Sequence, residues 1–109
     1  MSNSYCFYFR PEIKTVTVAQ LPDEIDSFDG VTYTIYKVSG SMSNDEYVEI
    51  NRLINNTGNS KDWNNSCFGL DLSDVKDLTK LSYVSWPILN ITIPNDVSEF
   101  SDDMCTCRH

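Results

Sequence analysis

The feature that most constrains the fold of this 109-residue chain is a period-two pattern at Val31–Val38. The stretch is filled with Val, Thr, Tyr and Ile, which favour extended backbone, and successive side chains of a strand point to opposite faces. Gly40 ends the pattern. These residues predict a strand, and a strand of this kind needs a sheet with a second layer over one face.

Shorter segments elsewhere have the same character. Apolar or alternating stretches predict further strands at residues 5–10, 13–19, 67–70, 83–86 and 88–93. Pro11 and Pro87 adjoin such stretches, and proline is confined to the edges and bends of sheets. The acidic segment 21–30 predicts a loop with one helical turn, and its last two residues, Asp29-Gly30, suit a tight hairpin-type turn.

One long helix is indicated by both its start and its stop. Ser43 and Glu46 form a capping-box pattern, and apolar residues at helical spacing follow them. Asn55-Asn56-Thr57-Gly58 then predicts the end of the helix, so we expect it at about 44–55. The polar segment 56–66 is expected to form a long loop.

A second, short helix is expected at about 74–81, where Val75, Leu78 and Leu81 share one helical face after Ser73 as a cap. The order of elements predicts an α+β fold: a mostly antiparallel sheet of about 4–6 strands with the helices on one face. The length fits a single domain, residues 1–109, with a flexible C-terminal tail at about 102–109.

The charge balance narrows the class of partner. The chain has sixteen acidic and eight basic residues, which gives a net charge of −8. This charge argues against direct binding of nucleic acid or of an anionic membrane. The chain has no apolar run near the ~18 residues that span a bilayer and no basic, apolar leader at its start, so we expect a cytoplasmic protein.

The acidic residues fall in clusters, and two of the clusters are candidate partner-binding sites. One reading is an ordinary solvated surface with acidic helix starts; the other is a negative face that steers and binds a basic protein. The candidate partner-binding acids are Asp23, Glu24, Asp26, Asp29, Asp45, Glu46 and Glu49.

Trp63 is the aromatic candidate for the same interface. It lies within a polar segment, where an exposed tryptophan is a typical binding hot spot. The alternative is that Trp63 folds back and covers the sheet.

Catalysis has little support in the sequence. The single histidine, His109, is the last residue, and the phosphate-binding and metalloprotease motifs are absent. We therefore expect no enzyme activity, no cofactor and no resident metal. Cys6 and Cys67 are expected to be buried thiols, whereas Cys105, Cys107 and His109 have some character of a metal site but lack its usual spacing.

These features predict a small acidic inhibitor that binds and occludes a basic protein. The most natural case is an immunity protein that neutralises a cognate bacterial toxin, often a nuclease. One alternative is a phage-type anti-defence protein that mimics nucleic acid, with carboxylates spaced like phosphates. A second alternative is a small enzyme or metal-binding domain that uses the C-terminal Cys/His cluster.

Overall fold

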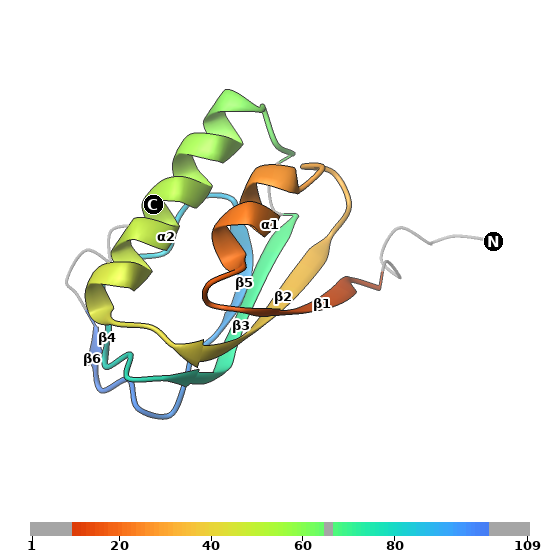
Figure 1. Ribbon diagram of the computed structural model, residues 1–109. Coiled ribbons are helices and arrows are strands. Elements are labelled where there is room, and N and C mark those ends of the chain that lie inside the picture. Colours follow the sequence, from red (N-terminus) through yellow and green to blue (C-terminus); the bar gives the residue numbers. More distant parts are fainter. Residues whose placement is uncertain (1–9, 65–66, 101–109) are drawn as a thin grey trace.

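The computed structural model describes residues 10–64 and 67–100, which form two helices and six strands (Figure 1). In chain order the elements are β1 (Glu12–Thr17), α1 (Leu21–Ser27), β2 (Thr34–Ser41), α2 (Asn44–Ser60), β3 (Phe68–Lys76), β4 (Lys80–Leu81), β5 (Ile88–Thr92) and β6 (Glu99–Phe100). The predicted strand at 5–10 and the predicted tail at 102–109 lie outside the described residues.

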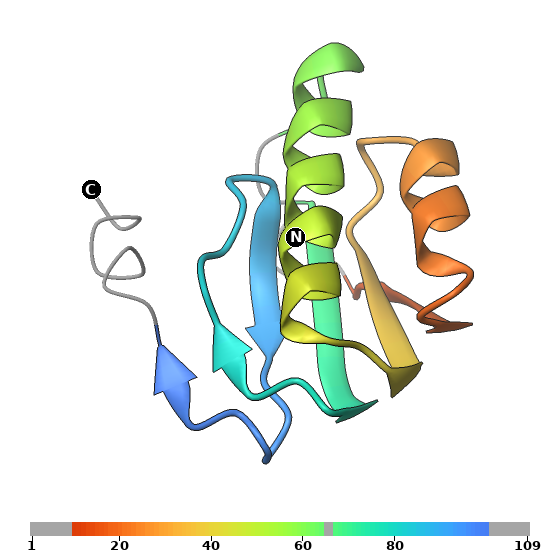
Figure 2. The same cartoon turned by 60° about the vertical axis from the view of Figure 1, so that its left-hand side comes forward.

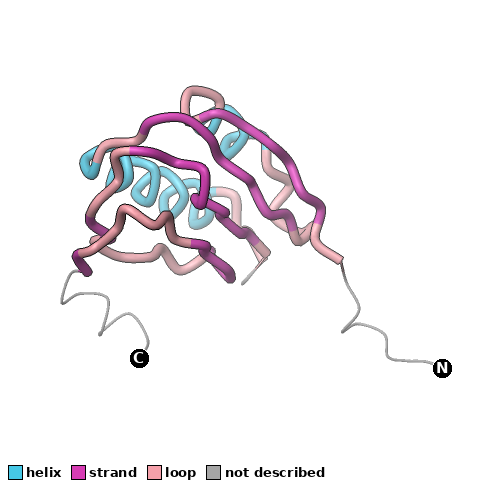
Figure 3. The backbone as a smooth tube through the Cα atoms, turned by 90° about the horizontal axis from the view of Figure 1, so that it is seen from below, coloured by secondary structure: helices cyan, strands magenta, loops and turns pink. Residues whose placement is uncertain are grey.

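The main sheet has four strands in the order β1-β2-β3-β5, and every neighbouring pair is parallel. Seen from below, these strands follow one another as one twisted layer (Figure 3). Helices α1 and α2 each connect one strand to the next, and both lie on the same side of the sheet (Figure 2). This arrangement follows from two crossovers of the usual right hand that step in the same direction across the sheet. Strands β4 and β6 form a separate two-stranded parallel pair.

The prediction of a mostly antiparallel sheet is therefore wrong. It rested on alternation, which is typical of antiparallel sheets with one wet face, whereas parallel strands usually read as continuous apolar runs because both their faces are covered. Here the helices cover only one face, so parallel strands carry an alternating pattern. Strand β2 illustrates this, because Tyr36 and Val38 are fully buried while Lys37 between them is exposed.

The predicted helix at 74–81 is also wrong, because its three apolar residues belong to three different segments: Val75 lies in β3, Leu78 in the connection that follows and Leu81 in β4. Between the paired positions Lys37↔Asp71 and Ser39↔Asp74, one residue of β2 faces two residues of β3. The extra residue changes the phase of the strand, so Leu72 and Val75 are both buried at a spacing of three. Val75, Leu78 and Leu81 are buried at the same spacing, which imitates the apolar face of a helix. Strand β3 instead continues to Lys76, and a turn follows in which Asp77 has φ +75°.

Two other segments differ from the predicted elements. Segment 21–30 was predicted as a loop with one helical turn, but α1 occupies seven of its residues. Residues 83–86, predicted as a strand, form an irregular segment instead. This segment is fixed to α2, because Ser85 donates from its amide to Asn51 Oδ1 at 2.9 Å and from its hydroxyl to the Asn51 carbonyl at 2.6 Å.

Helix α2 begins as predicted but ends later. The capping box is present: Glu46 N–H donates to Ser43 Oγ at 3.1 Å, and Ser43 N–H donates to Glu46 Oε1 at 2.8 Å. The helix then continues through Gly58 to Ser60, although Asn, Thr and Gly are poor helix formers. Tertiary packing outweighs propensity here, because Gly58 is buried and a Cβ at this position would lie 3.1 Å from Trp86 and 3.2 Å from Trp63.

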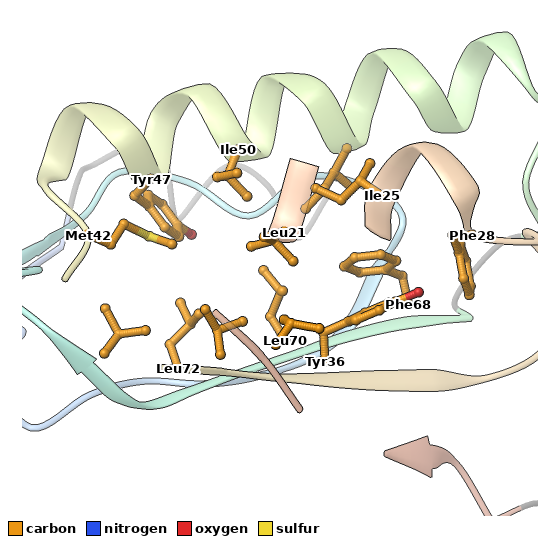
Figure 4. Close-up of a cluster of buried hydrophobic side chains, with 14 of the residues drawn as sticks. Leu21, Ile25, Phe28, Tyr36, Met42, Tyr47, Ile50, Phe68, Leu70 and Leu72 are labelled. Carbon is orange, nitrogen blue, oxygen red and sulfur yellow. The ribbon is translucent and has the colours of Figure 1, made fainter. Parts of the chain in front are cut away.

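The hydrophobic core lies between the two helices and the covered face of the sheet (Figure 4). Leu21 and Ile25 of α1 and Tyr47 of α2 are fully buried, and they face Leu70 and Leu72 of β3. The core therefore fixes both helices against the same strands.

The other side of the sheet is called here the open face, because neither helix covers it. Apart from the bulge in β3, its positions alternate with the buried ones: Ile13, Thr15, Thr17, Ile35, Lys37, Ser39, Ser41, Gly69, Asp71, Ser73, Asp74, Lys76, Asn90 and Thr92. Most of these side chains are polar or small, so this face of a parallel sheet can remain in contact with water.

Candidate functional site

A groove of about 760 Å³ lies at the carboxyl ends of β1 and β2, where helices α1 and α2 begin. Open parallel sheets bind their ligands outside the carboxyl ends of the strands, so this is the expected place for a site. The residues that line the groove are Val18, Ala19, Pro22, Ile50 and Leu53, which are apolar, Glu46 and Glu49, which are acidic, and Thr17, Ser39, Gly40 and Ser41 at the strand ends.

The first wall of the groove is a turn that joins β1 to α1. Thr17 N–H donates to Gln20 Oε1 at 3.0 Å, and Leu21 N–H donates to the Val18 carbonyl at 3.3 Å. Pro22 is the second residue of the helix, in the first turn, where its missing N–H has no cost. The turn therefore holds the half-buried Val18 and the exposed Pro22 at the groove.

The opposite wall is the end of β2 and the start of α2. Gly40 has φ +111°, a backbone conformation that glycine adopts without strain. The Ser41 hydroxyl next to it donates to the carboxylate of Asp77. Asn44, the first residue of α2, accepts from the amides of Thr79 at 3.0 Å and Lys80 at 3.2 Å. These bonds fix the helix start to the turn that follows β3.

The two carboxylates of the groove lie one helical turn apart on α2. Glu46 is exposed, and the capping box occupies one of its oxygens. Glu49 is also exposed and forms an ion pair with Arg52 at 2.5 Å, which raises the pKa of the Arg52 guanidinium. An exposed ion pair of this kind contributes little to stability, because water and salt screen it. Both carboxylates can therefore accept a cation from a partner.

The groove is part of a wider negative surface, which we call the helix layer: residues 21–30 and 43–62. This layer contains Asp23, Glu24, Asp26, Asp29, Asp45, Glu46, Glu49 and Asp62, against only Arg52 and Lys61 as cations.

Ion pairs within the described chain neutralise only part of the helix layer. Glu24 pairs with Lys14 at 3.9 Å, and Asp26 pairs with Lys61 at 3.5 Å. Across residues 10–64 and 67–100, no cation lies within ion-pair distance of Asp23, Asp45 or Glu46. The open face, in contrast, carries two lysines, Lys37 and Lys76, and two aspartates, Asp71 and Asp74.

The structure thus brings the predicted acids onto one side of the molecule but joins only Glu46 and Glu49 in the groove. Asp29 has a local role at the other end of α1. It accepts from the Thr32 hydroxyl at 2.7 Å and from the amides of Val31 and Thr32 at 2.9 Å each. The hydrogen bonds from Thr32, and then that from Val31, lower the pKa of Asp29. Partner binding by these acids stays a prediction.

Trp63 is not an exposed hot spot; of its two predicted positions, the buried one is correct. The side chain is 5% exposed, stacks on Phe68 with ring centroids 5.6 Å apart and meets the edge of Phe28 at 4.9 Å. Gly30 makes this possible, because a Cβ there would lie 2.4 Å from Trp63 Cδ1. The polar residues around Trp63 gave no sign of this cluster.

Cys67 lies beside the same aromatic cluster, as predicted for a core thiol. It is 4% exposed, and its thiol donates to the Gly30 carbonyl at 3.2 Å. Burial raises the pKa of the Cys67 thiol, and the nearby charge of Asp29 adds to this effect. A thiol with a raised pKa is a poor nucleophile. Cys6, the other predicted core thiol, lies outside the described residues.

Sequence reasoning missed the apolar half of the groove. Val18, Pro22 and Leu53 belong to no motif and come from three separate elements. The missing step was the parallel direction of β1 and β2. With that direction known, the segments after each strand must meet at one edge of the sheet, and residues 18–22 and 40–46 follow as neighbours.

The part of the chain that the structure describes has no candidate metal site, because no three Cys, His, Asp or Glu side chains are grouped so that they could hold an ion. Cys105, Cys107 and His109 lie outside that part. Of the helices in the described ranges, neither is both long and apolar enough to cross a membrane.

The chain matches no model of a known protein family, no curated protein and no solved structure. Its site is therefore interpreted from its own geometry and charge.

Proposed function

We propose that this chain is a small acidic inhibitor that binds a basic protein and occludes its working surface. The most specific form of the proposal is a cytoplasmic immunity protein that neutralises a cognate bacterial toxin, with a nuclease as the natural target. The observation that supports it is the segregation of charge. Eight acidic residues and two basic ones share the helix layer, whereas the open face of the same sheet has no net charge.

The groove supports the same proposal, because it adds apolar surface to the acidic layer. Protein interfaces combine an apolar centre with a polar rim. In the groove, the apolar centre consists of Val18, Pro22 and Leu53, and the polar rim consists of Glu46 and Glu49. An anion or a nucleic acid would meet repulsion at this surface, whereas a lysine- or arginine-rich protein is attracted to it.

The mechanism is electrostatic steering followed by occlusion. A negative field attracts a basic partner and raises its association rate by about 10- to 1,000-fold at low salt. The carboxylates of the helix layer then occupy the cationic groups that the partner uses for its own substrate. A nuclease covered in this way cannot bind the phosphates of its nucleic acid.

The test is affinity capture with three baits, from the native cells or from a host that co-expresses the neighbouring genes. The first bait is the unchanged chain, and the second carries Asp23→Asn, Asp26→Asn and Asp45→Asn, which lie outside the groove. The third is a matched control with Asp74→Asn, Asp96→Asn and Glu99→Gln. It also loses three negative charges, all of them from exposed residues outside the helix layer.

The expected result is one stoichiometric basic protein whose activity the chain abolishes at equal concentration. Its association should slow steeply between about 0.05 and 0.5 M salt, and the helix-layer bait should retain less of it than the control bait does. Equal retention by all three baits, or capture of no partner, would contradict the proposal. A nucleic-acid-binding complex that added DNA or RNA displaces would instead indicate a mimic of nucleic acid.

A further inference from the structure

We propose that the groove is the anchor site for one segment of the basic partner, in which an arginine stands beside a large apolar residue. The apolar side chain packs against Val18, Pro22 and Leu53, and the guanidinium reaches Glu46 and Glu49. This inference rests on the proposed function and names the partner chemistry at one place in the helix layer.

The apolar contact is argued from volume and exposure. A groove of about 760 Å³ is within the size range of pockets that hold small ligands and therefore accepts a whole side chain. Leu53 and Val18 pack against the closed core but are only half-buried, and Pro22 is exposed. An incoming Leu, Met or aromatic residue would remove this apolar surface from water, which is the usual source of affinity at an interface centre.

The preference for arginine follows from the arrangement of the carboxylates. Glu46 and Glu49 are three residues apart on α2, and such residues are neighbours on one helix face. A guanidinium presents several N–H donors in a flat fork and can bond two carboxylates at once, whereas an ammonium is a point charge. Glu49 already binds one guanidinium, that of Arg52, in an exposed pair that a partner can replace.

A second copy of this chain is a poor occupant of the groove. Two copies would each bring a net charge of −8, and docking on the groove places a second chain against the helix layer. The edge strand near the groove, β1, carries Lys14 on the helix side of the strand, where it contacts Glu24. Charged residues at an edge strand oppose pairing with another strand. A foreign basic segment is therefore the occupant that the charges favour.

The test uses defined peptides and the full chain labelled with ¹⁵N. The probe is acetyl-Leu-Arg-Arg-Leu-amide, with matched peptides in which both arginines are replaced by lysine or by glutamine. Backbone amide shifts are followed during each titration. The arginine peptide should bind weakly, with a Kd on the order of 1 mM, and should shift the amides of residues 17–21, 39–41 and 46–53.

Two variants separate the apolar and the ionic parts of the proposal. Ala19→Trp places a large side chain at an exposed groove position without changing any charge, and should abolish binding. If Ala19→Trp alters the amide spectrum of the free protein, Leu53→Ala replaces it as the test of the apolar contact, because it removes part of the apolar surface of the groove. Glu46→Gln with Glu49→Gln keeps the capping-box geometry and should weaken arginine-peptide binding about five-fold, whereas Asp96→Asn with Glu99→Gln should leave it unchanged.

The outcomes also separate this inference from the proposed function. Shifts outside the groove, equal binding of the arginine and glutamine peptides, or full binding by Ala19→Trp would overturn the anchor site. If the helix-layer bait still loses its partner in that case, the inhibitor proposal stands without the groove. If the peptide binds in the groove but no basic protein is captured, the groove stands and the inhibitor proposal fails.

Discussion

The two faces of the main sheet have opposite characters. On the helix-covered face, Tyr36, Val38 and Leu70 are at most 1% exposed, and the helix layer above them carries eight of the sixteen acidic residues but only two of the eight basic ones. On the open face, Ile13 is 58% exposed, and apart from Ile35 the other residues of this face are polar, charged or glycine. The difference shows that a parallel sheet does not need two covering layers when every second residue is polar or small. It also separates stability, which depends on the covered face, from binding, which we assign to the outer surface of the helices.

The largest expected effect is a difference in the free energy of unfolding between two variants, each with one side chain truncated on one face of the sheet. Leu70→Ala removes a fully buried side chain between the sheet and the helices and should lower the free energy of unfolding by about 3–4 kcal/mol. Ile13→Ala removes an exposed side chain of the open face and should cost less than about 1 kcal/mol. Urea unfolding of both variants at pH 7 measures the difference. Equal losses would mean that something covers the open face in solution.

The sequence anticipated the parts of the fold that local rules determine. The capping box at Ser43 and Glu46 placed the start of α2, because its bonds join residues only three apart. The alternation at Val31–Val38 predicted a strand, which the structure places three residues later. Sheet direction was wrong, since alternation reports which face is buried and says nothing of how strands are paired.

The candidate site could be predicted only in part for the same reason. Local composition found the clusters of acids, and the structure places most of the helix-layer acids on α1 and α2, with Asp29 and Asp62 just after the helix ends. The apolar residues of the groove depend on the meeting of two distant strand ends. Trp63 depends on the absence of a side chain at Gly30, more than thirty residues earlier in the chain. Such long-range conditions leave no local pattern.

The next largest effect compares two glycines, one on each side of the sheet. Gly30→Ala combines φ +79° with a Cβ 2.4 Å from Trp63, so it should destabilise the chain by about 3 kcal/mol. Gly69→Ala brings its Cβ to 2.9 Å from Ile35 Cγ1, but that side chain lies on the open face, where it can rotate away. We expect a cost below about 1 kcal/mol there. Thermal unfolding followed by circular dichroism checks both, and a severe effect of Gly69→Ala would show that Ile35 is held in place.

The stability of the covered face should also depend on pH in the alkaline range, through the ionisation of Tyr36. Burial raises the pKa of Tyr36 to about 12, and the charges of Glu24, Asp29 and Glu12 add to this effect. Because the unfolded tyrosine loses its proton near pH 10, the contribution of neutral Tyr36 to stability is complete below pH 10 and is lost as the pH rises through about 12.

The loss amounts to about 2–3 kcal/mol over that interval. It should be measured as the difference between the unchanged chain and Tyr36→Phe in urea unfolding at pH 9, 10, 11 and 12. The variant keeps the ring, so it cancels the ionisation of the other tyrosines. A difference that stays constant with pH would contradict the burial of the Tyr36 hydroxyl.

The smallest effect belongs to the one charged pair of positions on the open face, where Lys37 and Asp71 are partners in the register of β2 and β3. Partial burial raises the pKa of Asp71, but the hydrogen bonds from the hydroxyl and amide of Ser73, together with the charge of Lys37, outweigh it, so the pKa lies below its usual value. Asp71 therefore contributes stability above the ordinary carboxyl pKa, and that contribution is lost as the pH falls through the lower, folded value.

Asp71→Asn should reduce the free energy of unfolding by less than about 1 kcal/mol at pH 7 and by nothing at pH 2. The matched control is Asp74→Asn in the same strand, an exposed residue for which no side-chain bond is found within the described chain. A loss at pH 7 as large as that of Leu70→Ala would show that charges on the open face stabilise the fold as strongly as the buried core does. Stability would then depend on both faces of the sheet, and not on the covered face alone.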